Sequence, residues 1–331
     1  MSQFNNTSFH NNPARKRPTS KGKAEGQKGR RTAFIIGSVV IVLLLTIIGI
    51  SLYITTVAPF RRTIIRVDDT TINMDYFLMR TRFADADPME MIKLLTNEQL
   101  VKMGAPRYVA EVTPEDVDQK LRDVARGESE TISESEFKEW YRQLLNQMDL
   151  SDSEYREIAT TSLLASRLHE YLAERMSTVA EQIHVYNILL KTEEDAEEIR
   201  VRWEAGENFT DLAREVSLDE QSKENGGDLG WLPRGFLAGG FDEVAFNLSI
   251  GDVSEPLIYL SEPTSSEAEI FYYLLMVSEK AEAREIDEGP LQILEAKLLD
   301  DWLLEEKDFY EVEWNYNSEI HAWLHWQLLK E

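Results

Sequence analysis

The glycine-rich stretch at residues 224–241 is the part of this 331-residue chain whose composition most suggests a site. Six of the 16 glycines of the chain fall within its sequence, ENGGDLGWLPRGFLAGGF. Glycine at such density is typical of backbone with positive φ or of close approach between backbone segments. Large apolar residues alternate with the glycines, among them Trp231, Leu237 and Phe241, and exposed apolar residues of this size are typical of binding grooves. The stretch therefore indicates a binding groove.

Other kinds of chemistry have little support in the sequence. The chain has no cysteine, which excludes disulfides, thiol catalysis and a lipid-modified cysteine anchor. His321 and His325 are four residues apart, but HAWLH lacks the glutamate of a zinc-protease motif and no third ligand is evident. No glycine cluster opens a helix in a βαβ unit, and no G-x-S-x-G nucleophile motif occurs. We therefore expect neither a metal nor a cofactor.

Five stretches follow one another along the second half of the chain. They are NILLKT (187–192), NFTDLAREVSLDE (208–220), NGGDLGWLPRG (225–235), FDEVAFNL (241–248) and GDVSEP (251–256). In their order and spacing they resemble the parvulin family of peptidyl-prolyl cis/trans isomerases. The resemblance implies a domain at residues 181–282 with a four-stranded antiparallel sheet and surrounding helices. It also implies that the glycine-rich stretch shapes a pocket for proline.

The resemblance places apolar pocket residues on this chain. Leu237 stands at the family's pocket methionine and Phe241 at its pocket phenylalanine, with Phe246 nearby and Trp231 beside them. A pyrrolidine ring needs an apolar slot with aromatic walls, and glycines let the backbone pass close to it. The alternative is that these side chains belong to the core, and for Phe246 we favour this interpretation. We therefore expect Leu237 and Phe241 to bind substrate, with Phe246 and Trp231 as further candidate substrate-binding residues.

The polar positions depart from the family pattern. Parvulins typically carry two histidines, with a cysteine or aspartate between them. Here the first histidine position falls on Asn187, the central one on Asp219, and the last, after a long acidic loop at 261–269, on Tyr273. His184 is three residues before Asn187, so on a strand it would face the other side of the sheet. We predict Asp219, Asn187 and Tyr273 as catalytic residues, with a structural role as the alternative for Asn187 and Tyr273.

These residues lead to two functional hypotheses. The first is an active isomerase and chaperone for unfolded or newly exported, proline-containing polypeptides. The second is a catalytically weak or inactive peptide-binding scaffold, because both histidine positions are changed. An assembly factor for one membrane complex is a third and weaker possibility. Glutamates dominate residues 192–207, where phosphate-directed parvulins have a basic loop, so we do not expect phosphorylated substrates.

The N-terminal region indicates a membrane anchor. Residues 1–32 carry a net charge of +7 and are rich in polar residues, which predicts a disordered tail. The following segment, at 33–58, has no charge and is long enough for a transmembrane helix. A cleaved signal peptide is the alternative, disfavoured by the length of the apolar run and by Pro59. The basic tail then lies in the cytoplasm and the strongly acidic remainder outside the cell membrane. So acidic a region does not suit nucleic acid.

The remaining segments complete an α+β chain. Caps at Asn73, Thr113, Ser133 and Ser151 precede apolar-periodic runs and predict a mostly helical domain at 63–178. The start of this domain, VDDTTINMDYFLMR (67–80), is similar to the chaperone domain of exported foldases of the SurA and PrsA kind. Residues 283–331 are predicted as helices that pack on that domain. Its final helix, 318–329, is expected to be an ordinary buried helix, with partner binding through Trp323 and Trp326 as the alternative. The oligomeric state is left open.

Overall fold

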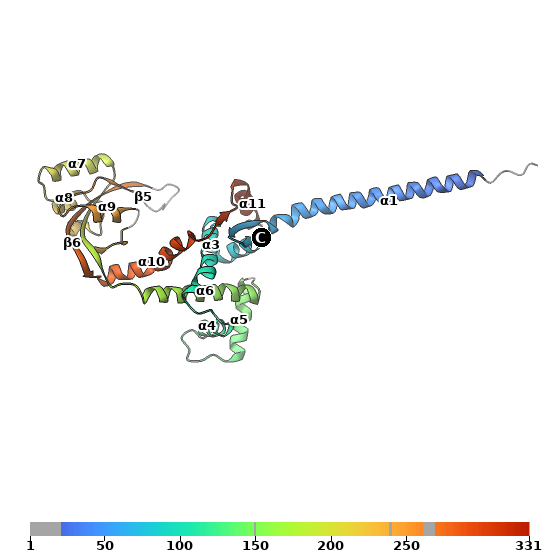
Figure 1. The fold of residues 1–331 in the computed structure, drawn as a ribbon, viewed down its shortest axis with the longest axis horizontal. Helices are drawn as coiled ribbons and strands as arrows, with labels where there is room; N and C mark the ends of the chain where they lie inside the picture. The colour runs from blue at the N-terminus through green and yellow to red at the C-terminus, as the bar shows by residue number, and fades with distance from the viewer. Residues whose placement is uncertain (1–20, 149, 238–239, 261–268, 331) are drawn as a thin grey trace, which may run out of the picture. The chain divides into compact units, whose positions relative to one another are not determined.

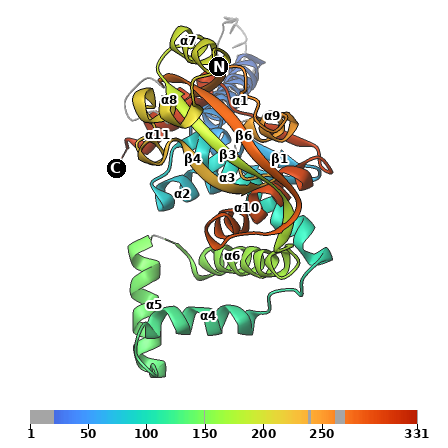
Figure 2. The ribbon, with the colours of Figure 1, turned by 90° about the vertical axis from the view of Figure 1, so that its left-hand side faces the viewer.

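The computed structural model describes residues 21–148, 150–237, 240–260 and 269–330, with side chains from residue 38 onward. Two compact units divide the chain (Figures 1 and 2). The first contains Met1–Ile64, Thr71–Arg80 and Asn315–Glu331, and the second contains Ile65–Thr70 and Thr81–Trp314. The fold class predicted from the sequence, α+β with an apolar N-terminal helix, is confirmed.

The first unit begins with α1, a helix that runs over Lys21–Thr56. Its part at Ser38–Thr56 is long and apolar enough to cross a membrane and is the one such helix in the described part of the chain. The prediction of a disordered tail through residue 32 is wrong from Lys21 onward, because extending an existing helix costs far less than nucleating one. Residues 1–20 of that predicted tail lie outside the described residues.

A 3₁₀ turn, η1 (Ala58–Arg61), follows α1 and leads to the rest of the first unit. Asn73 caps α2 (Met74–Ala84) as predicted, since its Oδ1 accepts from the amide of Tyr76 at 3.0 Å. The last helix is α11 (Ser318–Leu328), capped by Asn317. Its Leu324 is fully buried, as the sequence analysis expected of this helix, but Trp326 is half exposed.

Helices form the first part of the second unit. They are α3 (Pro88–Gly104), η2 (Ala105–Arg107), α4 (Pro114–Arg126), α5 (Glu134–Met148) and α6 (Asp152–Ala173). Thr113 and Ser151 form reciprocal capping boxes at the starts of α4 and α6, and Ser133 makes the same contacts before α5. These caps were predicted because each depends on residues only three apart.

The chain returns to these helices after the second part of the unit. Helix α10 (Glu288–Lys307) packs against α3 and α6, and buries Trp302, Leu303 and the carboxylate of Glu306. Glu306 accepts a hydrogen bond from Arg107, in η2. Strand β7 (Val312–Trp314) then pairs antiparallel with β1 (Thr63–Val67), and a further strand, β2, covers Thr70–Asn73.

A four-stranded antiparallel sheet forms the second part, with strand order β4-β3-β6-β5, and this confirms the predicted architecture. Its strands are β3 (Val179–Leu190), β4 (Asp228–Pro233), β5 (Leu257–Leu260) and β6 (Ile270–Glu285). Helices α7 (Glu193–Glu204) and α8 (Phe209–Val216) cover one face, while α9 (Phe241–Asn247) covers the other. Figure 2 shows α8 and α9 on opposite sides of β3 and β6.

Candidate functional site

Alternate residues of the two long strands, β3 and β6, belong to different hydrophobic cores. On β3, Ile183 and Val185 belong to the core beneath α9, and Ile188 and Leu190 belong to the core beneath α7 and α8. Asn187 follows Val185 by two residues, pairs with Leu275 of β6 and is buried at 3% exposure. Alternation therefore places Asn187 on the α9 face of the sheet.

A hydrogen-bonded network joins Asn187 to the loop after α8. The amide nitrogen Nδ2 of Asn187 donates to Asp219 Oδ2 at 2.8 Å. The Ser222 hydroxyl lies 2.6 Å from both Asn187 Oδ1 and Asp219 Oδ2, and can donate its one proton to either acceptor. The amide of Gln221 donates to the other oxygen of Asp219 at 3.2 Å. Both ends of the Asn187 amide therefore lie within hydrogen-bonding distance of a partner, and Asp219 is held in one orientation.

This network decides the charge of Asp219. Burial alone disfavours the carboxylate and raises the pKa of Asp219. The hydrogen bonds donated by Ser222, Asn187 and two backbone amides outweigh that effect, so the pKa lies below its ordinary value. Asp219 is consequently an anion at neutral pH.

One glycine of the stretch at 224–241 is required by the contact between this loop and β3. Gly227 has φ of 82°, and its carbonyl accepts from the amide of Asn187 at 2.8 Å. A Cβ atom at residue 227 would lie 2.2 Å from the carbonyl oxygen of Asn187, which no side chain can occupy. The glycine therefore allows the loop to reach the strand that carries the polar network.

An open cavity of about 630 Å³ lies next to Asn187 and Asp219. Polar side chains occupy one part of its wall, and apolar or aromatic side chains form the remainder. The lining residues are Asn187, Asp219, Gln221, Leu229, Leu237, Phe241, Ile258, Tyr259, Leu260, Tyr273 and Leu275. A cavity of this size accepts a small apolar group such as a proline ring with its flanking peptide bonds.

Tyr273 stands at the centre of an aromatic group in this cavity. Its ring packs edge-to-face against Phe241 and against Tyr259, with ring centroids 5.8 and 5.4 Å apart. Burial, together with the nearby charge of Asp219, raises the pKa of Tyr273 to about 12. The hydroxyl therefore keeps its proton at neutral pH and can act as a hydrogen-bond donor.

The structure brings five of the seven predicted residues to this cavity: Asn187, Asp219, Leu237, Phe241 and Tyr273. Phe246 is 5% exposed and lies in the core beneath the cavity, as the core interpretation expected. Trp231 pairs with His184 on β3, and the two rings are 5.5 Å apart on the opposite face of the sheet. This placement does not fit a role for Trp231 in substrate binding.

A β-bulge puts Leu229 and Trp231 on different faces of the sheet. Val185 pairs with Gly230 and Tyr186 pairs with Asp228, so one extra residue, Leu229, interrupts β4. Simple alternation would put Leu229 and Trp231 on one face, whereas Leu229 lines the cavity and Trp231 does not.

The sequence did not indicate the other lining residues, nor Ser222, which contacts the polar network. These lining residues are Gln221, Leu229, Ile258, Tyr259, Leu260 and Leu275. Ser222 has a weak local signal, because it follows Asp219 by three residues. Tyr259 follows Pro256 on an edge strand and gives no such signal. Of the long acidic loop predicted at 261–269, all residues except Glu269 lie outside the described residues.

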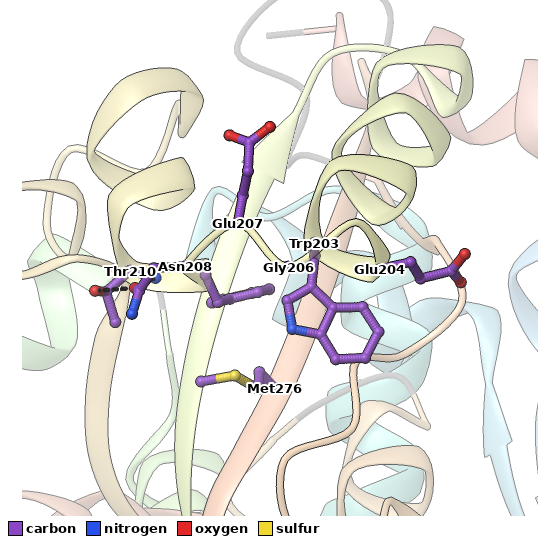
Figure 3. Close-up of a pocket in the computed structure, with 8 residues that line it drawn as sticks. Trp203, Glu204, Gly206, Glu207, Asn208, Thr210 and Met276 are labelled. Carbon is purple, nitrogen blue, oxygen red and sulfur yellow. Dashed lines mark hydrogen bonds between the residues drawn. The ribbon is translucent and has the colours of Figure 1, made fainter.

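A second hollow of about 630 Å³ lies on the α7 and α8 side of the domain (Figure 3). Trp203 and Met276 form its apolar part, and Glu204 and Glu207 point away from it. Glu207 is ion-paired with Arg202 at 2.8 Å. Because no polar groups converge there, this hollow is a weaker candidate than the cavity beside Asp219. No cluster of metal-ligating side chains occurs in the described residues.

Comparison with known proteins defines the class of this domain. Residues 189–278 match the family described as Rotamase, the PPIC-type PPIase domain. This part of the chain is a parvulin-type domain.

The wider chain is similar to foldases. The foldase protein PrsA of Oceanobacillus iheyensis is 32% identical over 170 residues, which cover 49% of this chain and 54% of the relative. PrsA of Halalkalibacterium halodurans is 27% identical over 224 residues, covering 61% and 63%. The chain thus matches less than two thirds of the length of either relative. A solved structure of the peptidylprolyl isomerase PrsA from Bacillus anthracis matches at 20% identity and a TM-score of 0.39, covering 72% of this chain and 96% of that one.

Proposed function

We propose that this protein is a membrane-anchored peptidyl-prolyl cis/trans isomerase and chaperone. The observation that carries the proposal is the meeting of an ionised carboxylate, Asp219, with an apolar and aromatic cavity of suitable size. The parvulin-type domain and the similarity to foldases support the same activity. Its substrates are unfolded or newly exported polypeptides that contain proline.

The reaction requires no bond to break, because only rotation about the X-Pro peptide bond is involved. Its barrier, near 20 kcal/mol, comes from the partial double bond of the planar amide. In that resonance form the carbonyl oxygen is partly negative and is stabilised by water. A proline ring held against Leu237 and Phe241 would place the preceding carbonyl in the partly dry cavity near Asp219.

Two features of the cavity would then lower the barrier. The loss of water and the negative charge of Asp219 both disfavour the polarised, planar form of the amide. The Tyr273 hydroxyl can donate a hydrogen bond to the amide nitrogen, whose lone pair is released in the twisted state. Asn187 and Ser222 position Asp219 and do not need to touch the substrate.

We propose that the protein acts at the outer face of the cell membrane. α1 supplies one helix that can cross the bilayer, and the basic residues before it favour a cytoplasmic N-terminus. The helices at 74–173 provide the chaperone part, by similarity to the foldases.

NMR exchange spectroscopy tests the isomerase activity directly. The full chain in detergent micelles would be added in small amounts to a proline-containing tetrapeptide, and the cis/trans exchange rate measured. We expect acceleration that Leu237→Ala and Asp219→Asn each reduce by about tenfold, which corresponds to roughly 1.4 kcal/mol of lost transition-state stabilisation. Ile250→Ala is the matched control, since Ile250 is exposed and outside the cavity, and should leave the rate unchanged.

A non-catalytic peptide-binding module is the second candidate. It is favoured by Asn187, which is buried and donates to Asp219 within the protein, where parvulins typically have a histidine. In this case the tetrapeptide resonances would shift on addition of protein without faster exchange, and Leu237→Ala would weaken binding alone. That result would overturn the isomerase proposal.

A further inference from the structure

Helix α11 leaves an apolar face exposed at the end of the chain. Leu324 is fully buried, whereas Trp326 and Leu329, on the other side of the helix, are 52% and 71% exposed. The ammonium group of Lys330 lies 3.0 Å from the centre of the Trp326 ring. Tryptophan and leucine next to a basic residue are typical of helices at the lipid–water interface.

Contacts within the first unit hold α11 close to the end of α1. The Trp323 ring packs edge-to-face on Phe60 with centroids 5.3 Å apart. The amide of Asn315 donates to the carbonyl of Ile64 at 2.8 Å. A cavity of about 160 Å³ is lined jointly by Pro59, Arg62, Met74, Glu319, Ile320 and Trp323. Helix α11 is therefore attached to the residues that follow the candidate membrane span.

The short connection between α1 and Phe60 determines how far from the hydrocarbon core α11 lies. Phe60 follows Thr56, the last residue of α1, by four residues, and three of them lie in a 3₁₀ turn that rises about 2 Å per residue. The polar layer on each side of the hydrocarbon core is roughly 5–8 Å thick. With Ser38–Thr56 across the core, Phe60 and the Trp323 ring beside it lie at or just above headgroup level.

The charged residues after α1 and at the end of α11 also suit a lipid headgroup layer. Arg61 and Arg62 are exposed directly after α1, although the whole chain has a net charge of −25. Together with Lys330 they place three cations where lipid phosphates lie. Trp326 follows Trp323 by one helical turn and so extends the aromatic group formed with Phe60.

We propose that α11 is a second membrane contact, in which Trp326 and Leu329 enter the interfacial layer while Arg61, Arg62 and Lys330 meet lipid phosphates. The inference rests on the proposed membrane span of α1. It gives the protein two attachments to one membrane surface: a helix that crosses it near the start of the chain and a helix that lies on it at the end.

The absence of native cysteine permits a direct test by site-directed spin labelling. Single cysteines would be introduced by Leu329→Cys and Ala322→Cys on the exposed face of α11. Leu45→Cys reports on the membrane span, and Ile250→Cys on an exposed site in the parvulin-type domain. Each labelled full chain is placed in nanodiscs of phosphatidylglycerol and phosphatidylethanolamine, one chain per disc. The collision rate of each label is then measured with oxygen, which enters lipid, and with a nickel chelate, which stays in water.

We expect the labels at residues 329 and 322 to collide more with oxygen and less with the nickel chelate than the label at residue 250. If the labels at residues 329 and 322 show the same collision rates as the label at residue 250, while the label at residue 45 is lipid-exposed, the inference is wrong and the membrane span stands. If they are shielded from both reagents, protein covers α11 and the inference is also wrong. A water-accessible label at residue 45 would overturn the membrane span and the inference together.

Discussion

At the scale of single residues, the candidate site is built around groups that keep their charge. Asn187 cannot ionise, Asp219 remains an anion because donated hydrogen bonds lower its pKa, and burial keeps Tyr273 protonated. No histidine is present among the described residues that line the cavity. A site of this kind acts through fixed electrostatics rather than through a group that titrates near pH 7.

The first prediction concerns the pH dependence of the isomerase rate. Asp219 is ionised above its lowered pKa, and Tyr273 is neutral below about 12, so neither changes between about pH 5 and 8. We expect kcat/KM measured by NMR exchange to be constant over this range. A fall near pH 6.5 would instead show that a histidine takes part, and His184→Gln would then identify whether it is the one on the opposite face.

The second prediction concerns stability. A folded-state pKa below the unfolded value of about 3.9 means that ionised Asp219 stabilises the fold; this contribution is complete above that value and is lost as pH falls through the folded-state pKa. In urea unfolding, Asp219→Asn should therefore cost more free energy at pH 7 than at pH 3. Asp211→Asn, on the exposed face of α8, is the control. Equal costs at both pH values would contradict the assignment of Asp219.

Sequence reasoning reached part of this site and not the rest. Asp219, Leu237 and Phe241 lie in motifs that can be read locally, and the structure places all three at the cavity. Ser222 contacts Asn187 across 35 positions of sequence, and a pairing of that kind depends on the loop geometry. Trp231 was named from its place in the glycine-rich stretch, which does not indicate the face of the sheet on which a side chain lies.

At the scale of elements, the turn before β4 is constrained by its contact with β3. The third prediction is that Gly227→Ala destabilises the protein by on the order of 3 kcal/mol, since the new Cβ meets the backbone of Asn187 and φ is positive. Gly251 has a similar φ of 89° but open space around it, so Gly251→Ala should cost only about 1–2 kcal/mol. Urea unfolding of both variants measures their losses in the free energy of unfolding. Similar losses would mean that the positive φ alone, and not the contact with Asn187, causes the destabilisation.

The fourth prediction concerns the contact of α10 with α3 and α6. Trp302→Ala removes a buried ring from that contact and should reduce the free energy of unfolding by about 3–5 kcal/mol. Leu304→Ala, two residues along the same helix and largely exposed, should change it by less than about 0.5 kcal/mol. Hydrogen exchange in α3 and α6 measures the effect where it is expected, and unchanged exchange in Trp302→Ala would contradict it.

Elements with local signals were predicted, and those that depend on distant partners were not. The N-caps Asn73, Thr113 and Ser151 each place a side chain next to a backbone amide a few residues away, and all three helices begin where predicted. The short strand β7 was missed because it exists only through pairing with β1, at the other end of the chain. For the same reason β6 extends past Val277, where the continuous apolar run ends, to Glu285.

At the scale of the whole molecule, α1 and the candidate site lie in different compact units. The fifth prediction is that a chain starting at residue 63 is recovered in the aqueous phase and keeps the isomerase rate of the full chain on tetrapeptides. Detergent phase separation and NMR exchange measure the two properties. Loss of the rate in a chain that remains folded by circular dichroism would show that the anchor contributes to the site.

The chain passes from the helical part into the parvulin-type domain and back at neighbouring positions. Its first and last strands are neighbours, Val179 pairs with Glu285, and the amide of Ile286 donates to the carbonyl of Thr178 at 2.8 Å. Synthesis proceeds from the N-terminus, so α10 can join α3 and α6 only after the complete inserted domain has been made. Before that domain folds, it forms a long flexible loop between α6 and α10. Once it has folded, its two ends are adjacent, so the loop that must be closed is short, and the entropic cost of packing α10 against α3 and α6 is lower. The folding of the parvulin-type domain is therefore also a step in the folding of the helices that carry it.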